Sequence, residues 1–149
     1  MMSTDDAKRG YFPVTNALGR YFTPRDHYAS VRLGLTEALS AGATTVHNWA
    51  HNIATPEHAD AELRAMRDGG LRGRFSYGTA QGAPNNQPMD LAGLAKIKQQ
   101  WMPNDGMLTL GISSRNVGDD TNPLRGNISV DVARKDWGGA RALGLPIDR

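Results

Sequence analysis

Two histidines, a tryptophan and two asparagines gather in one short stretch, TTVHNWAHN, which runs from Thr44 to Asn52. His47 and His51 lie four positions apart, a spacing that would place both on one face of a helix. The β-branched residues before His47 favour a strand instead, in which positions 45, 47, 49 and 51 share one side. These residue types are compatible with three interpretations: a metal site, the wall of a substrate pocket, or the polar end of a buried strand.

A metal site needs more ligands than this stretch supplies. Structural zinc takes four protein ligands and catalytic zinc takes three, and no carboxylate or further histidine is spaced to join His47 and His51. The chain has no cysteine, which excludes thiolate zinc sites, disulfides and cysteine nucleophiles. Ser113 together with His47 lacks a positioned acid, so a serine-type triad is not expected. We therefore predict no metal ligand and no catalytic residue in this chain.

A pocket wall suits His47 and Trp49 better, because an imidazole can donate a hydrogen bond and an indole can stack on a flat ring. The competing interpretation is a satisfied buried histidine beside a core aromatic residue. His51 and Asn52 follow the strand in its loop, where they either contact a substrate or cap the next helix. The full set that we predict to bind substrate is His47, Trp49, His51, Asn52, Tyr77, Ser113 and Arg115.

Two arginines on the strands raise the question of how their charge is balanced. Arg74 and Arg115 alternate with apolar positions, and burying a lone charge is costly. Asp119 or Asp120 in the following loop could pair with Arg115, and a substrate anion is the other candidate. The sequence leaves both partners open.

The composition is that of a globular domain: 149 residues, 39% apolar, with a formal charge of +2 from 17 Lys and Arg against 15 Asp and Glu. This charge is too small to indicate nucleic-acid binding, and the arginines form no basic run. No apolar stretch approaches the roughly 18 residues of a membrane span, and the first ten residues, MMSTDDAKRG, contain no apolar secretory segment. Together with the absence of cysteine, these features predict a cytoplasmic protein.

Helix and strand signals alternate along the chain. Thr23 and Thr55, each followed by proline, are typical helix starts, and glycines follow the helical patterns. His27 and His58 lie in the first turns of these two helices, where we expect them to be solvated. We predict helices at 24–41, 56–68, 90–102 and 129–143, and strands at 44–49, 71–77, 107–113 and 145–147.

Alternating helices and strands indicate an α/β fold with a parallel sheet, formed by residues 23–149 as one domain behind an N-terminal arm at 1–22. Each of the first three predicted strands has one apolar face and one face of polar or small residues, whereas a sheet covered on both sides reads as a continuous apolar run. This pattern favours a barrel wall with helices on one face only. The loops after the second and third strands are long, which predicts a ligand at the carboxyl ends of the strands.

The stretch GATTVHNWAHNIATPEHADAELRAMRDGGLRGRFSYG resembles the amidohydrolase superfamily, in particular its cytosine-deaminase-like and chlorohydrolase-like branch. Members of that branch typically show a GxTTV strand, then TPE, then an arginine-bearing strand that ends in YG. The preceding YFTPRDHYASVRLGLTEALSAG and the final ARALGLPI resemble helices of these enzymes, so the likeness extends from Tyr11 to Ile147. The resemblance implies part of a (β/α) TIM-type barrel, about strands two to four and the start of strand five.

The same resemblance implies a hydrolase that uses zinc or iron to hydrolyse C–N or related bonds, as in deamination. In that family an HxH pair on the first strand, histidines after the fifth and sixth strands and an aspartate after the eighth bind the metal. This chain has no HxH pair. We therefore expect it to hold no cofactor and to be inactive alone, contributing the walls of a pocket for a small cyclic or amide-containing ligand.

An open piece of barrel has unpaired sheet edges, which predict a homo-oligomer. The alternative to a hydrolase fragment is a stand-alone small-molecule-binding or structural α/β domain derived from such a barrel. Neither nucleic acid nor a membrane is an expected partner for either.

Overall fold

The computed structural model describes residues 10–118 and 127–148. After a first helix, helices and strands alternate in the order that the sequence predicts, and each predicted end lies within two residues of the observed one. The elements are α1 (Tyr11–Gly19), α2 (Pro24–Ser40), β1 (Thr45–Ala50), α3 (Pro56–Gly69), β2 (Arg72–Tyr77), α4 (Leu91–Trp101), β3 (Leu108–Ser113), α5 (Val130–Ala142) and β4 (Ile147–Asp148).

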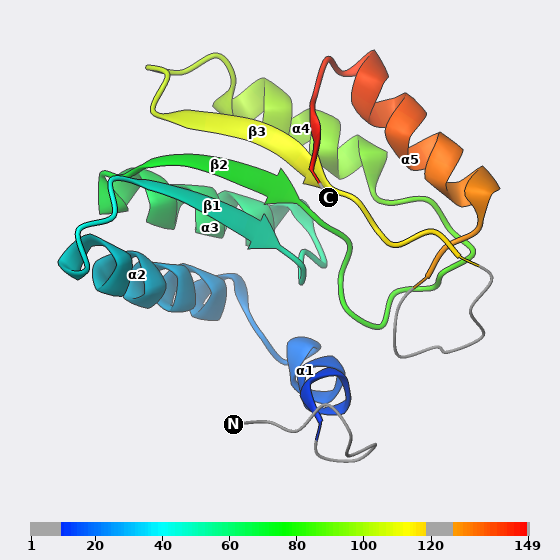
Figure 1. Ribbon diagram of the computed structural model, residues 1–149, viewed down its shortest axis with the longest axis horizontal. Helices are drawn as coiled ribbons and strands as arrows, with labels where there is room; N and C mark the ends of the chain where they lie inside the picture. Colours follow the sequence, from blue (N-terminus) through cyan, green and yellow to red (C-terminus); the bar gives the residue numbers. More distant parts are fainter. Residues whose placement is uncertain (1–9, 119–126, 149) are drawn as a thin grey trace.

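The four strands form one sheet in the order β1-β2-β3-β4, and all neighbouring strands run parallel. The sheet curls like half of a barrel, with α3, α4 and α5 on its convex side and α2 packed alongside α3 (Figure 1). In the described part of the chain, no helix covers the concave side. The predicted α/β class, with a parallel sheet and helices on one face, is confirmed.

Apolar side chains on the convex side of the sheet form the core together with the helices. Phe75 and Tyr77 of β2 and Ile112 of β3 are at most 1% exposed, and the rings of Phe75 and Tyr77 meet edge to face with centroids 6.5 Å apart. Leu94 and Ile97 of α4 belong to the same cluster and are fully buried. Burial of each such side chain stabilises the fold by about 1.5–3 kcal/mol. The two-residue alternation within the strands thus decides which side of the sheet carries the core.

The start of α2 is a complete capping box. The Thr23 side chain accepts a hydrogen bond from the Asp26 amide, and the Asp26 carboxylate accepts one from the Thr23 amide at 2.8 Å. Thr55 also precedes its helix, but its hydroxyl contacts His58 Nδ1 at 3.0 Å instead of a backbone amide. Gly70 ends α3 with a φ of 71°, a left-handed conformation that glycine adopts without steric cost. The predicted starts of α2 and α3 are therefore right.

His27 is buried, and the prediction that it is solvated is wrong. Its Nδ1 lies 2.6 Å from Glu62 Oε1, and the second carboxylate oxygen of Glu62 accepts a hydrogen bond from Asn48 Nδ2 at 2.7 Å. His58 is half-buried, and its Nε2 donates to the Phe22 carbonyl across 3.0 Å. Helical periodicity in the sequence predicts which residues of α2 share a face, but it does not reveal their partners. Glu62 of α3 contacts His27 directly, and Asn48 of β1 contacts the same carboxylate.

Helix α1 lies within the predicted N-terminal arm, where the sequence did not indicate a helix. It has no side-chain cap and no acidic residue in its first turn, so the usual start signals are missing. Asn52 Nδ2 donates to the Gly19 carbonyl at 3.2 Å and connects the end of α1 to the loop after β1. None of the described helices combines the length and the apolar character needed to cross a membrane.

Candidate functional site

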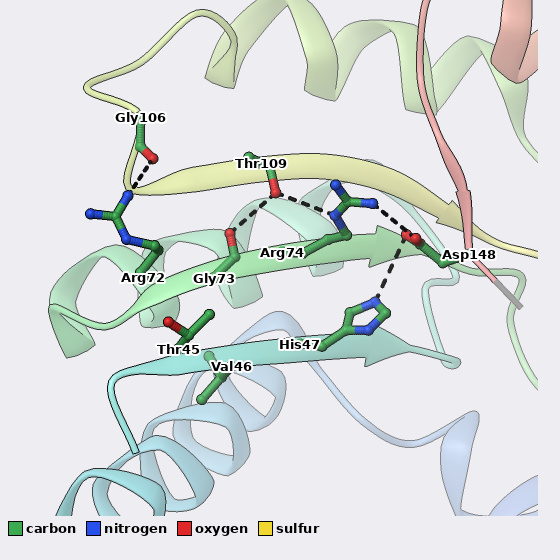
Figure 2. A pocket seen from close by; sticks show the side chains of 9 residues that line it. All are labelled: Thr45, Val46, His47, Arg72, Gly73, Arg74, Gly106, Thr109 and Asp148. Atoms are coloured by element: carbon green, nitrogen blue, oxygen red, sulfur yellow. Dashed lines mark hydrogen bonds and ion pairs between the residues drawn. The ribbon is translucent and has the colours of Figure 1, made fainter. Parts of the chain in front are cut away.

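The concave side of the sheet carries a hollow of about 580 Å³ (Figure 2). Its floor comes from residues that pair in register across the strands, Thr45 with Arg72, His47 with Arg74, and Arg74 in turn with Thr109. Because paired residues of a parallel sheet point to the same side, these side chains share the concave face. The residues that line the hollow are Thr45, Val46, His47, Arg72, Gly73, Arg74, Gly106, Thr109 and Asp148.

The carboxylate of Asp148 connects three strands of this face. Arg74 Nη1 donates to Asp148 Oδ1 at 2.9 Å, and Ser76 Oγ donates to Asp148 Oδ2 at 2.6 Å. His47 Nε2 lies 3.8 Å from the same Oδ2 atom (Figure 2). The side chain of Asp148 is only 16% exposed, so its carboxylate is partly shielded from water. The ion pair with Arg74 balances its negative charge there.

His47 and Trp49 lie side by side on the concave face of β1. Their rings stack with centroids 5.5 Å apart and planes at 20°. His47 Nε2 also contacts Ser76 Oγ at 2.7 Å. The side chain of His47 is 40% exposed and Trp49 is 37% exposed, so neither is the buried histidine or core aromatic of the competing interpretation. His47 lines the hollow, and Trp49 lies beside it on the same face of β1, outside the lining.

Ser76, Thr109 and Asp148 were not among the predicted site residues, although the structure brings them to this face. Arg74 Nε donates to Thr109 Oγ1 at 3.4 Å. Gly111 of β3 makes room for Asp148, because a β-carbon at Gly111 would lie 2.5 Å from Asp148 Oδ2. A glycine inside a strand often marks such a close approach, and that signal could have pointed to this place.

The hollow lies nearer to the amino ends of the strands than the loop lengths predict. Thr45 and Arg72 are the first residues of β1 and β2. Arg72 Nη1 donates to the carbonyl of Gly106, which precedes β3, at 3.2 Å. Asp148 stands at the opposite end of the group (Figure 2). Apart from Gly106, the residues that line the hollow belong to strands. Part of the long loop after β3, residues 119–126, lies outside the described residues.

Three other residues predicted to bind substrate, His51, Asn52 and Tyr77, do not line the hollow. His51 lies beside Trp49, with ring centroids 5.8 Å apart, and burial lowers its pKa. Asn52 holds the end of α1 through Gly19 and does not cap the helix that follows it. Tyr77 is 1% exposed on the convex side, where burial and the Asp90 carboxylate raise its pKa. Tyr77 therefore belongs to the core and does not line the hollow.

Ser113 and Arg115 also lie away from the hollow. Ser113 is 5% exposed and pairs in register with Asp148 at the edge of the sheet, and the serine that contacts His47 is Ser76. Arg115 Nη2 lies 2.8 Å from Asp136 Oδ2 of α5 and also donates to a backbone carbonyl. The charge of Arg115 is thus balanced inside the protein, and the partners suggested from the sequence, residues 119 and 120, lie outside the described residues.

The zinc or iron that the amidohydrolase resemblance implies does not fit the side chains described here. Within residues 10–118 and 127–148, no three histidine, cysteine, aspartate or glutamate side chains come together as a set that could hold a metal ion. His47 and His51 of the opening stretch have Trp49 between them and contact it from either side.

No family model, curated protein or solved structure matches the chain. The resemblance to amidohydrolases therefore rests on the sequence motifs between Tyr11 and Ile147. The parallel half-barrel is compatible with a piece of a TIM-type barrel, in which helices surround the sheet on the outside only.

Proposed function

We propose that the concave face binds a small, flat, cyclic or amide-containing molecule, as one wall of the substrate pocket of an amidohydrolase-like barrel hydrolase. The observation that carries the proposal is the polar, solvent-facing inner side of a parallel half-barrel, where Arg74, Asp148 and Ser76 support an exposed His47 stacked on Trp49. Structural sheets of this kind normally bury such a face. Here the concave face instead carries the charged side chains of Arg74 and Asp148 beside a hollow, which supports a role in ligand binding.

Each group of the face would contribute a recognisable interaction. Trp49 lies between His47 and His51 but remains 37% exposed, and an aromatic contact of a flat ring with this exposed part contributes about 0.5–1.5 kcal/mol. Arg72 and Arg74 have N–H donors for a carbonyl or amide oxygen. The hollow of about 580 Å³ falls within the usual range for small-molecule sites.

The proposal assigns binding, not bond cleavage, to the residues of this chain. Ser76 is fully buried and directs its proton to Asp148, so it is unsuited to attack a substrate as a nucleophile. The metal chemistry of the resembled family would have to come from other residues. A stand-alone binding domain derived from such a barrel would use the same face, and it makes the same prediction for ligand binding.

A titration with 2-pyridone, a flat ring with adjacent N–H and C=O groups, tests the proposed function. We expect the NMR signals of His47 and of the Trp49 indole to shift during the titration. Trp49→Ala should weaken binding about three- to tenfold, the equivalent of one aromatic stack. Leu33→Ala, which removes a 64% exposed side chain from α2, is the control and should leave affinity unchanged. No shift at Trp49 up to millimolar ligand, or equal losses in both variants, would rule out this site.

A further inference from the structure

The hydrogen bonds around His47 have only one consistent direction. An ionised carboxylate can only accept, so Asp148, which is paired with Arg74, receives the hydroxyl proton of Ser76 across 2.6 Å. Ser76 Oγ then presents a lone pair to His47 Nε2, which lies 2.7 Å away. His47 Nε2 must therefore carry a proton and donate it. The 3.8 Å approach of this nitrogen to Asp148 Oδ2 favours the same proton position.

The other ring nitrogen of His47, Nδ1, is an acceptor whenever the imidazole is neutral. It has no hydrogen-bond partner within residues 10–118 and 127–148. The side chain is 40% exposed, and Trp49 covers a face of the ring and not its edge, where the lone pair lies. Nδ1 is thus available to a molecule on the concave face.

We propose that Asp148, acting through Ser76, holds neutral His47 in its Nε2–H tautomer and thereby makes Nδ1 the hydrogen-bond acceptor of the site. The proposal rests on the proposed function and specifies its ligand class. Arg72 and Arg74 supply donors on the same face, so the complementary ligand carries an N–H donor beside a carbonyl acceptor, as a lactam does. Ser76 and Asp148 are positioning residues, because they act through His47.

Asp148→Asn tests this arrangement in a way that a packing defect would not imitate. The amide keeps the shape of the carboxylate but replaces one oxygen with a donor. Arg74 holds the remaining oxygen, so the NH2 group faces Ser76 and donates to its Oγ. Because Ser76 is fully buried, its hydroxyl proton needs an acceptor, and His47 Nε2 is the remaining side-chain partner of Ser76 Oγ. The preferred tautomer of His47 inverts to Nδ1–H.

Long-range 1H–15N NMR spectra of the full chain distinguish a protonated from an unprotonated ring nitrogen. In spectra of the neutral imidazole, we expect His47 to carry its proton on Nε2 in the wild type and on Nδ1 in Asp148→Asn. Asp131→Asn is the matched control, since its side chain is 84% exposed on α5, and it should keep the wild-type tautomer. A wild-type His47 protonated on Nδ1, or no inversion in Asp148→Asn, overturns the proposal.

Ligand selection gives a second, separable measurement. N-methyl-2-pyridone keeps the ring and carbonyl of 2-pyridone but lacks the N–H donor. We expect the wild type to bind 2-pyridone about tenfold more tightly, the equivalent of one hydrogen bond, and Asp148→Asn to bring this ratio close to one. Equal wild-type affinities overturn the inferred ligand class and leave the binding function standing. Failure of both ligands to bind overturns the binding function, and the NMR tautomer then decides the role of Asp148 by itself.

Discussion

Gly111 of β3 lies directly against the carboxylate of Asp148, which belongs to β4. A β-carbon at this position would come within 2.5 Å of Asp148 Oδ2 and 3.2 Å of the Pro146 carbonyl oxygen. Gly111→Ala therefore pushes Asp148 away from Arg74, and overpacking of this kind costs about 1–3 kcal/mol. We expect a lower free energy of unfolding in urea and a weaker preference of His47 for its Nε2–H tautomer.

Gly138 of α5 is the matched control for this substitution. A β-carbon at Gly138 would meet no atom within 4 Å, and Gly→Ala inside a helix stabilises by roughly 0.5–1 kcal/mol. The two substitutions should thus change the free energy of unfolding in opposite directions. If Gly111→Ala were as stable as the wild type, the close approach of Asp148 to β3 would not matter for the fold.

Glu62 is the buried charge on which α2, α3 and β1 converge. Its two carboxylate oxygens contact His27 Nδ1 at 2.6 Å and Asn48 Nδ2 at 2.7 Å. Glu62→Ala leaves both of these polar groups without their partner, and breaking a buried pair in this way costs about 3–5 kcal/mol. Urea unfolding should show that loss. The control is Glu37→Ala on the exposed side of α2, which should lower the free energy of unfolding by less than about 0.5 kcal/mol. A similarly small loss for Glu62→Ala would mean that the buried pair contributes no net stability.

For single residues, the sequence predicts a side of the sheet but not a partner. The alternation around His47 and Arg74 places both on the polar side, as found. Ser76 and Asp148 are 72 positions apart, and they meet because β4 pairs with β3, a tertiary event that no local pattern encodes. Tyr77 shows the same rule from the other side, because the alternation that puts Arg74 in the hollow puts Tyr77 in the core.

Among the elements, α2 depends on its capping box for its first turn. Thr23→Ala removes the hydroxyl that accepts a hydrogen bond from the Asp26 amide, and loss of such a cap costs about 1 kcal/mol. We expect this loss in urea or thermal unfolding. Thr36→Ala is the control on the same helix, because the Thr36 hydroxyl only bonds the Arg32 carbonyl one turn back. Equal losses in the two variants would show that the cap has no special importance.

The same substitution should change how α2 responds to pH. Hydrogen bonds from the Thr23 side chain and from its amide lower the pKa of the Asp26 carboxyl. A carboxyl with a lowered folded-state pKa contributes stability above its unfolded pKa, about 3.9 for aspartate, and loses it as the pH falls through the lowered value. In Thr23→Ala, an NMR titration should show the pKa of Asp26 moving up toward its ordinary range. An unchanged pKa would contradict this account of the shift.

Helices and strands were predictable where their signals are local. Thr23, Gly70 and the alternation within each strand act within a few residues, so the boundaries of α2 to β3 lie close to their predicted places. Helix α1 has no side-chain cap. It is tied to the rest by the contact between Asn52 and Gly19, 33 positions apart, which a local pattern cannot reveal.

At the scale of the whole molecule, the two faces of the sheet differ. All-parallel sheets are normally covered on both faces, but within residues 10–118 and 127–148 no helix covers the concave side (Figure 1). The polar character of the concave side follows from the sequence of each strand, so it was predictable. The curl of the sheet and the return of Asp148 over β3 depend on the pairing of all four strands, so they were not.

The sheet also has two open edges, because among the described residues β1 pairs only with β2 and β4 only with β3. Edge strands readily pair with another chain. Two copies of a four-stranded sheet supply the strands of a closed eight-stranded barrel, in which each copy would cover the edges and the concave face of the other. We therefore expect the isolated chain of residues 1–149 to form a dimer or a higher oligomer, with a mass in light scattering that rises with concentration.

A charge at the start of β1 tests whether this association uses the sheet. Thr45 is exposed and pairs in register with Arg72, so Thr45→Lys adds a second positive charge where the two copies would meet, and lysine on an edge strand opposes pairing. We expect this variant to dissociate at concentrations where the wild type and Thr36→Lys, with its new charge on the exposed side of α2, remain associated. If the wild type stayed monomeric at high concentration, the polar concave face would be stable in water without a cover. If both lysine variants dissociated alike, the contact would lie on the helices and the half-barrel would remain open.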